Sequence, residues 1–146
     1  MNSSNHILVG KTGEELALTF LKEKGYEILH TNLRLEKVEV DIIAKDKNQI
    51  VFVEVKTRSS AMVEPEKAVN KSKQKNLQRA AEIFLEERQL KNELRFDIIA
   101  IVKQKNNTDI EHFEDAFYPY YNFSFYLFYK FPLFACSRSS ASNKAL

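Results

Sequence analysis

The stretch VEVDIIAKDKNQIVFVEVK, residues 38–56, decides the fold. Two runs rich in β-branched residues, 38–44 and 50–56, flank a polar segment that is typical of a turn, Asp46-Lys47-Asn48-Gln49. This pattern predicts a β-hairpin. If the hairpin is centred on the middle of the turn, Asp41 lies directly across from Glu54 and Glu39 lies across from Lys56.

The predicted hairpin brings two carboxylates together. Opposed side chains in an antiparallel pair have Cβ atoms roughly 5 Å apart, so the carboxylates of Asp41 and Glu54 would repel each other unless a cation lay between them. A hard divalent ion with oxygen ligands fits this position, and Mg²⁺ (or Mn²⁺) fits best. Such an ion can bridge a phosphate, and Lys56 on the same face could orient the attacking water, which indicates phosphodiester hydrolysis.

The same charges could simply form a solvated hairpin face with ion pairs across the strands. Two features argue against that interpretation. Phe52 and Ile43 share the face of the carboxylates, and alternating valines occupy the other face, so burial on both sides is expected. Acidic residues in a strand of this kind need partners.

The flanking sequence predicts two helices. Thr12 and Glu15 have the spacing of a capping box, and Gly25 follows the apolar stripe of the first helix. Pro65 precedes a second, longer run of helical periodicity. We expect helices at 13–24 and 66–90, and strands at 26–33, 38–44, 50–56, 94–102 and 110–113. This αβββαββ order predicts an α/β fold, a mixed β-sheet flanked by helices.

Composition divides the chain of 146 residues into two regions. We assign one domain to residues 10–117 and a C-terminal extension to residues 118–146, which is rich in Phe and Tyr and contains no acid. The single cysteine, Cys136, and the absence of a signal-like N-terminus lead us to expect a cytoplasmic protein. A formal net charge of only +2 means that any site for a polyanion must be local.

The extension is apolar for about one membrane width, but Pro119, Lys130 and Pro132 interrupt it, so we expect no membrane-spanning helix. Packing on the domain, self-association as a homodimer and contact with a membrane surface are all compatible with its composition. The residues do not rank these three alternatives.

Several motifs together resemble a known family. Asp41 followed by Glu54-Val55-Lys56 resembles the PD-(D/E)xK nuclease signature, and the chain as a whole is similar to the bacterial YraN-like family. The motifs that carry this resemblance are Gly10-x-x-Gly13-Glu14-x-x-Ala17, Gly25-Tyr26-x-Ile28-Leu29, Asn32-x-Arg34, Glu39-Val40-Asp41-Ile42-Ile43-Ala44, Phe52-Val53-Glu54-Val55-Lys56-x-Arg58, Arg95-Phe96-Asp97 and Ile110-Glu111-His112. That family is similar to archaeal Holliday-junction resolvases of the restriction-endonuclease-like superfamily.

The resemblance implies a role for each matching residue. Asp41 and Glu54 would hold the metal, Lys56 would be the base that orients water, and Glu14 would be an additional catalytic acid. The chain departs from the family pattern at Val38, where the family usually has Gly, and the aromatic extension has no counterpart in that pattern.

Two basic residues are candidates for contacts with nucleic acid. Arg58 directly follows the strand of Glu54, and Lys73 lies where the start of the long helix would face the sheet. Positive charge beside a nuclease site gives binding that is independent of base sequence and sensitive to salt. Asp97 is better explained as a structural acid beside Arg95, and the three histidines show no metal-ligand spacing.

These observations predict a metal-dependent endonuclease that acts on DNA phosphodiesters, with branched or damaged DNA implied by the resolvase resemblance. DNA is the expected partner, and no small-molecule cofactor is expected. The alternative is a non-catalytic module that keeps the nuclease fold and binds nucleic acid or another protein.

Overall fold

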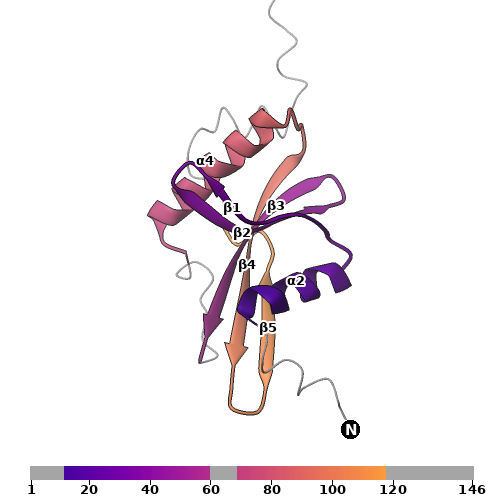
Figure 1. Cartoon of the computed structure of the whole chain (residues 1–146), viewed down its shortest axis with the longest axis vertical. Helices are drawn as coiled ribbons and strands as arrows, with labels where there is room; N and C mark the ends of the chain where they lie inside the picture. The colour runs from indigo at the N-terminus through magenta and orange to yellow at the C-terminus, as the bar shows by residue number, and fades with distance from the viewer. Residues whose placement is uncertain (1–11, 60–68, 118–146) are drawn as a thin grey trace, which may run out of the picture.

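A computed structural model describes residues 12–59 and 69–117 of the chain. Its elements are α2 (Gly13–Glu23), β1 (Glu27–Leu35), β2 (Val38–Asp46), β3 (Gln49–Arg58), α4 (Lys71–Glu87), β4 (Glu93–Lys103) and β5 (Thr108–Phe113), shown in Figure 1. The predicted α/β class and the αβββαββ order are confirmed.

The five strands form one mixed sheet in the order β1-β2-β3-β4-β5. Neighbouring strands are antiparallel except β3 and β4, which are parallel. A parallel pair needs a crossover connection, and α4 lies within the segment that joins β3 to β4. The strand that carries Glu54 is therefore in the middle of the sheet.

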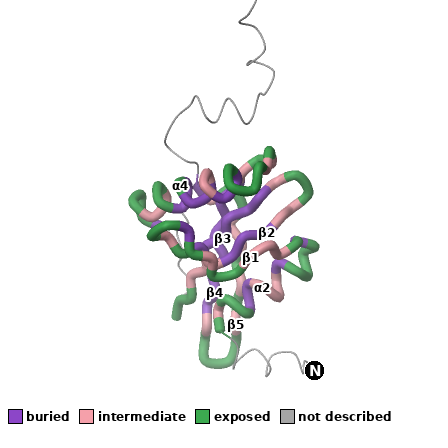
Figure 2. The backbone as a smooth tube through the Cα atoms, turned by 45° about the horizontal axis from the view of Figure 1, so that its top comes forward, coloured by how far each residue is buried: buried purple, intermediate pink, exposed green. Residues whose placement is uncertain are grey.

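The two helices cover opposite faces of the sheet. Leu77, Ala81 and Phe84 of α4 pack with Phe52 and Phe96 in one apolar cluster. The second cluster lies under α2 and consists of Leu16, Ala17, Leu21, Tyr26, Ile42, Ala44, Val51, Val53, Ile99 and Ile101. Figure 2 shows that the central strands are buried between the two helices while the turns are exposed. Removing this apolar surface from water supplies the main driving force for the fold.

The ends of α2 agree with the capping signals. Thr12 Oγ1 accepts a hydrogen bond from the Glu15 amide at 3.2 Å, and Glu15 Oε2 accepts one from the Thr12 amide at 2.7 Å. Gly25 has a φ of 89°, a left-handed conformation that glycine adopts without steric cost. The capping box therefore fixes the position of Glu14 in the first helical turn.

The predicted start of the long helix is wrong. Asn70 is extended and caps the helix, because its Oδ1 accepts the Lys73 amide at 2.8 Å, so α4 begins at Lys71 rather than at residue 66. An asparagine N-cap satisfies a free amide of the first turn, which Pro65 cannot do. At the other end Gln89, with a φ of 53°, lies beyond the last helical residue, Glu87.

The predicted hairpin register is confirmed, but the ladder is shorter than expected. Paired residues run from Asp46 opposite Gln49 to Ile42 opposite Val53, and the expected pairs of Asp41 with Glu54 and of Glu39 with Lys56 are not part of it. Beyond Ile42, strand β2 continues its pairing with β1 alone, where Glu39 lies opposite Arg34. The side chain of Asp41 explains where the ladder ends, as described below.

Within residues 12–59 and 69–117, no helix is long and apolar enough to cross a membrane. The extension at 118–146, and with it the alternatives for its packing, lies outside the described residues.

Candidate active site

Glu54 is the buried centre of the candidate site. It lies on β3, two residues after Phe52 and therefore on the sheet face that α4 covers, and only 2% of it is exposed. Its Oε1 accepts hydrogen bonds from the ammonium groups of Lys56 and Lys73, both at 2.6 Å. Its Oε2 is buried and has no hydrogen-bond partner among the residues that the structure describes. Both ammonium groups therefore bind the same oxygen of this carboxylate.

Asp41 lies where the regular alternation of β2 is interrupted. Val40 packs in the cluster under α4, whereas Ile42 packs in the cluster under α2. Asp41 Oδ2 accepts a hydrogen bond from the Val55 amide at 2.7 Å. The Asp41 carboxylate replaces a backbone carbonyl oxygen as the acceptor for this amide of β3. The β2–β3 ladder therefore ends at this point.

The surroundings of Asp41 raise its pKa to about 6 from 3.8. Burial is the largest cause, and the negative charges of Glu54 and Glu14 add to it. The hydrogen bond from Val55 and the positive charge of Lys73 act in the opposite direction. The interactions show that the predicted acids Glu14, Asp41 and Glu54 share one electrostatic environment.

Glu14 approaches this environment from the start of α2. A Cβ atom on the preceding residue, Gly13, would collide with Thr57 Oγ1, so glycine lets the helix approach the end of β3 closely. The Glu14 carboxylate is exposed and accepts a hydrogen bond from Asn32 Nδ2 at 3.1 Å. The close approach of α2 to the end of β3 thus brings Glu14 near enough for its charge to act on Asp41.

Asn32 is a site residue to which the sequence analysis gave no role. It lies on β1 between the pairs Thr31–Ile42 and Leu33–Val40, so it is across from Asp41. Its φ of 49° is left-handed, a conformation that asparagine tolerates better than most residues. An asparagine within a strand pattern is the signal that could have indicated this position.

The two lysines reach Glu54 from different elements. Lys56 lies on the same strand, two residues further on, and 22% of its side chain is exposed. Lys73 comes from the first turn of α4 with 37% of its side chain exposed, and it points toward the sheet as its helical position predicts. Arg58 lies beyond Lys56 at the exposed end of β3, where its Nη1 donates to the Thr57 carbonyl oxygen at 3.1 Å.

The donor set fits a hard divalent cation. Among the residues that the structure describes, no three His, Cys, Asp or Glu side chains form a metal-binding group, so a metal would have few protein ligands. Mg²⁺ commonly binds in this way, through one or two carboxylates and several waters. Among the described residues, Oε2 of Glu54 has no hydrogen-bond partner, and burial raises the pKa of Asp41, so both carboxylates retain capacity for a further positive ligand.

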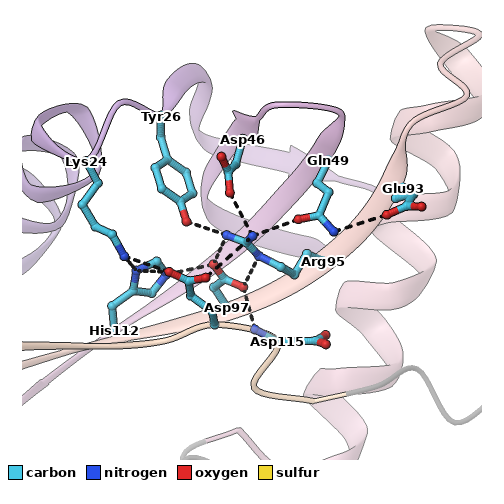
Figure 3. Close-up of polar contacts among 10 residues, drawn as sticks. Lys24, Tyr26, Asp46, Gln49, Glu93, Arg95, Asp97, His112 and Asp115 are labelled. Atoms are coloured by element: carbon cyan, nitrogen blue, oxygen red, sulfur yellow. Dashed lines mark hydrogen bonds and ion pairs between the residues drawn. The ribbon is translucent and has the colours of Figure 1, made fainter.

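A second polar cluster, shown in Figure 3, lies on the opposite face of the sheet. Its centre is Asp97, which is opposite Val53 in the β3–β4 ladder, whereas Glu54 is opposite Ile98. Asp97 is 0% exposed, and Arg95 donates to both of its oxygens, from Nε at 3.0 Å and from Nη2 at 2.9 Å.

Further hydrogen bonds complete the partners of Asp97. His112 Nε2 lies 2.8 Å from Oδ2, and the Asp115 amide donates to Oδ1 at 3.0 Å. Burial raises the pKa of Asp97, but the bonds from His112 and Arg95 outweigh it and hold the pKa below its usual value. The interpretation of Asp97 as a structural acid beside Arg95 agrees with this geometry.

The fold and these contacts define a class: a mixed α/β protein in which two acids and a lysine of the hairpin strands meet a second lysine from the start of α4. A family model described as "Uncharacterised protein family UPF0102" matches residues 13–101. The chain belongs to this family, which agrees with the YraN-like resemblance of its motifs.

Individual relatives support the assignment. A UPF0102 protein of Christiangramia forsetii is 47% identical over 116 residues, which cover 79% of this chain and 98% of the relative. A UPF0102 protein of Bacteroides thetaiotaomicron is 42% identical over 117 residues, covering 80% of this chain and 97% of the relative. A UPF0102 protein of Caldicellulosiruptor saccharolyticus is 47% identical over 113 residues, which cover 75% of this chain and 96% of the relative.

Proposed function

We propose that this chain is a metal-dependent endonuclease of the restriction-endonuclease-like superfamily that hydrolyses DNA phosphodiesters. The observation that carries the proposal is the buried Glu54, whose Oε2 has no partner within residues 12–59 and 69–117 while Asp41 and two lysines lie beside it. A buried acceptor without a partner is costly, so its retention favours a ligand at this position. Branched or damaged DNA is the proposed substrate class, from the resemblance to resolvases.

In this proposal Asp41 and Glu54 hold Mg²⁺ (or Mn²⁺). When bound, such an ion stabilises charge on a phosphate and lowers the pKa of a water ligand. Asp41 is held in place by the Val55 amide, and Glu54 is held by its two lysines. Both carboxylates are therefore positioned before any substrate arrives.

Lys56 orients the attacking water and stabilises negative charge that develops on the phosphate. Its ammonium is fixed by Glu54, and part of the side chain remains exposed toward solvent. A preorganised positive group of this kind acts most strongly where charge develops in the transition state. Glu14, oriented by Asn32, serves as the additional acid at the edge of the site.

Arg58 and Lys73 contact the DNA backbone. Arg58 lies at the exposed end of β3, and Lys73 lies at the start of α4, so the two positive groups flank the carboxylates. Their contacts are with phosphates, which are the same in every sequence, so binding should weaken steeply with salt and show little base preference.

The test is cleavage of linear, flapped and four-way DNA in Mg²⁺ or Mn²⁺. We expect cleavage by the full chain, and its loss in Asp41→Asn and Glu54→Gln, because the amides keep the shape of the side chains but lose the charge that holds a hard cation. The matched control is Arg79→Gln, which removes a charge from an exposed pair with Glu36 and should cleave like the wild type.

One observation favours the alternative, a nuclease-fold module without turnover. Glu54 already pairs with Lys56 and Lys73, so its charge is compensated by the protein's own side chains without a metal ion. Binding of four-way DNA in Ca²⁺, combined with no cleavage of any substrate in Mg²⁺ or Mn²⁺, would decide for this alternative.

A further inference from the structure

We propose that Lys73 is an exchangeable internal cation, which neutralises Glu54, is displaced when a divalent ion binds, and then contacts a backbone phosphate of DNA. The inference deepens the proposed function and rests on it. It gives Lys73 two successive partners, a carboxylate of the protein and a phosphate of the substrate.

The first step of the argument is a charge count at the site. Glu54, Asp41 and the exposed Glu14 supply at most three negative charges, and both ammonium groups already bind one oxygen of Glu54. A divalent ion would raise the positive charge from two to four against these three carboxylates. Uncompensated charge in a partly buried environment is strongly unfavourable, so departure of one ammonium stabilises the ion-bound form.

The second step identifies which ammonium leaves. Lys56 is only two residues from Glu54 on one strand face, so the backbone holds the pair together. Lys73 reaches Glu54 from another element, and its side chain is 37% exposed against 22% for Lys56. A short movement of a flexible side chain therefore takes the Lys73 ammonium into solvent.

The third step concerns the helix to which Lys73 belongs. Helix α4 has no acidic residue in its first turn, and Lys73 lies there beside the positive end of the helix dipole. A cation at this end is unfavourable by itself, so the present position of Lys73 depends on Glu54. Once a divalent ion binds Glu54, the positive end of the α4 dipole favours movement of the Lys73 ammonium toward an anion outside the protein. A DNA phosphate is such an anion.

The first experiment measures the affinity for Mn²⁺ by calorimetry in wild type, Lys73→Met and Arg79→Met. Loss of the competing ammonium should tighten Mn²⁺ binding by about 10-fold, within the usual range of coupling between two sites. Arg79→Met removes the same charge from α4 without touching Glu54 and should bind Mn²⁺ like the wild type, since Arg79 pairs with Glu36 and Glu82. Equal or weaker binding by Lys73→Met would overturn the displacement of Lys73.

Two further variants distinguish the effect of the lost charge from an effect of misfolding. Lys73→Gln removes the charge but keeps a hydrogen-bond donor, so it should show the same tightening as Lys73→Met. Lys73→Arg keeps the charge and should bind Mn²⁺ with wild-type affinity. Tightening in Lys73→Arg as well would show that charge is not the cause and would also contradict the proposal.

The second experiment tests the contact with phosphate. Binding of four-way DNA is measured against salt in Ca²⁺, and the log–log slope for Lys73→Met should be smaller than that of wild type by about 0.9, the value for one phosphate contact. Equal slopes would overturn the phosphate step while leaving the displacement intact.

A different result would reject the proposed function itself. If the wild type takes up no Mn²⁺ and its DNA binding is the same with and without Ca²⁺, the carboxylate pair is not a metal site, and the exchange fails together with it. If the wild type binds Mn²⁺ and Glu54→Gln abolishes this binding, the metal site stands, and only the behaviour of Lys73→Met decides the exchange.

Discussion

Asp97 and Glu54 are buried carboxylates on neighbouring strands and on opposite faces of the sheet, and they differ in how completely they are bonded. Asp97 is 0% exposed, and both of its oxygens accept hydrogen bonds from Arg95 and from further donors. Glu54 is 2% exposed, and one of its oxygens has no partner in the described part of the chain. Burial by itself therefore does not identify a functional acid, because a fully bonded carboxylate stabilises the fold and an incompletely bonded one leaves a position for a ligand.

The Arg95–Asp97 cluster also connects segments that are far apart in sequence. Arg95 donates to Tyr26, to Asp46 and to Gln49, at 2.6, 3.0 and 2.9 Å. It thereby joins the residue before β1, the ends of the hairpin strands and β4, whereas the bonds of Asp97 add β5 and the turn after it. We interpret the Arg95–Asp97 cluster as one that stabilises the fold, on the sheet face opposite the candidate site.

The largest predicted effect is on the structural cluster. Arg95→Met should destabilise the protein by about 3–5 kcal/mol, because it removes the cationic partner of a fully buried carboxylate. Glu54→Gln should change the free energy of unfolding by less than about 1 kcal/mol, since both lysines that it would leave can extend into solvent. Urea denaturation measures both. If Glu54→Gln lowered the free energy of unfolding more than Arg95→Met, the proposed difference between the two carboxylates would be wrong.

The next effect concerns the site alone. Lys56→Met should lower single-turnover cleavage of branched DNA by about 10²-fold at saturating Mn²⁺, the usual scale for losing a positioned electrostatic or proton-transfer group. The affinity for DNA should stay within about twofold, because Lys56 acts on the reacting phosphate and one phosphate contact contributes little to the total. Lys37→Met, in the exposed β1–β2 turn, is the control. Unchanged cleavage in Lys56→Met would remove Lys56 from the mechanism.

A smaller effect comes from the raised pKa of Asp41. The folded protein keeps this carboxyl protonated up to a pH of about 6, while the unfolded chain releases the proton near 3.8, so stability falls as pH rises between these values. Asp41→Asn removes the penalty and should stabilise the metal-free protein above pH 6 by about 1–2 kcal/mol, less than the full shift implies because the group is partly exposed.

This gain should fade as pH falls toward 4. Thermal denaturation across pH 4 to 8, in the presence of a chelator, measures it, and a constant difference between the two proteins would contradict the assignment of the pKa to Asp41. Added Mn²⁺ should stabilise the wild type and leave Asp41→Asn unchanged, because ligand binding to the folded state raises stability.

The smallest effect tests the left-handed residue beside Asp41. Asn32→Gly keeps the backbone conformation and should unfold like the wild type, whereas Asn32→Ala should be about 1 kcal/mol less stable than Asn32→Gly. Both variants lose the hydrogen bond to Glu14 and should show the same reduced cleavage. Different cleavage rates would show that the backbone, rather than the amide that holds Glu14, is what the site requires.

Local sequence signals predicted the elements well. The polar turn at Asp46 to Gln49 determined the hairpin register, and the capping box determined the start of α2. The failures occur where a side chain replaces a backbone partner. Asp41 ends the ladder by accepting the Val55 amide, and Asn70 caps α4 later than Pro65 suggested.

Contacts between distant segments were harder to predict. The proximity of Asp41 to Glu54, the place of Lys56 and the orientation of Lys73 followed from strand and helix periodicity, and Glu14 followed only from the family resemblance. The contact of Lys73 with Glu54 depends on how α4 packs on the sheet. The pairing of Arg95 with Asp97 follows from their spacing of two on one strand. Their bonds to Tyr26 and His112 depend on the arrangement of four elements, which no local pattern specifies.

The parallel pairing of β3 with β4 has a consequence for how the chain folds. The antiparallel strands β1 to β3 connect through short turns and can pair within about 1–10 μs, whereas β3 meets β4 only after residues as distant as Gln49 and Glu93 come together. During synthesis at about 5–20 residues per second, the edge of β3 that pairs with β4 therefore remains unpaired for seconds, until β4 has been made. In that interval we expect the charges of Glu54 and Lys56 on β3 to oppose pairing of its open edge with another chain, since charged side chains on an edge strand disfavour aggregation.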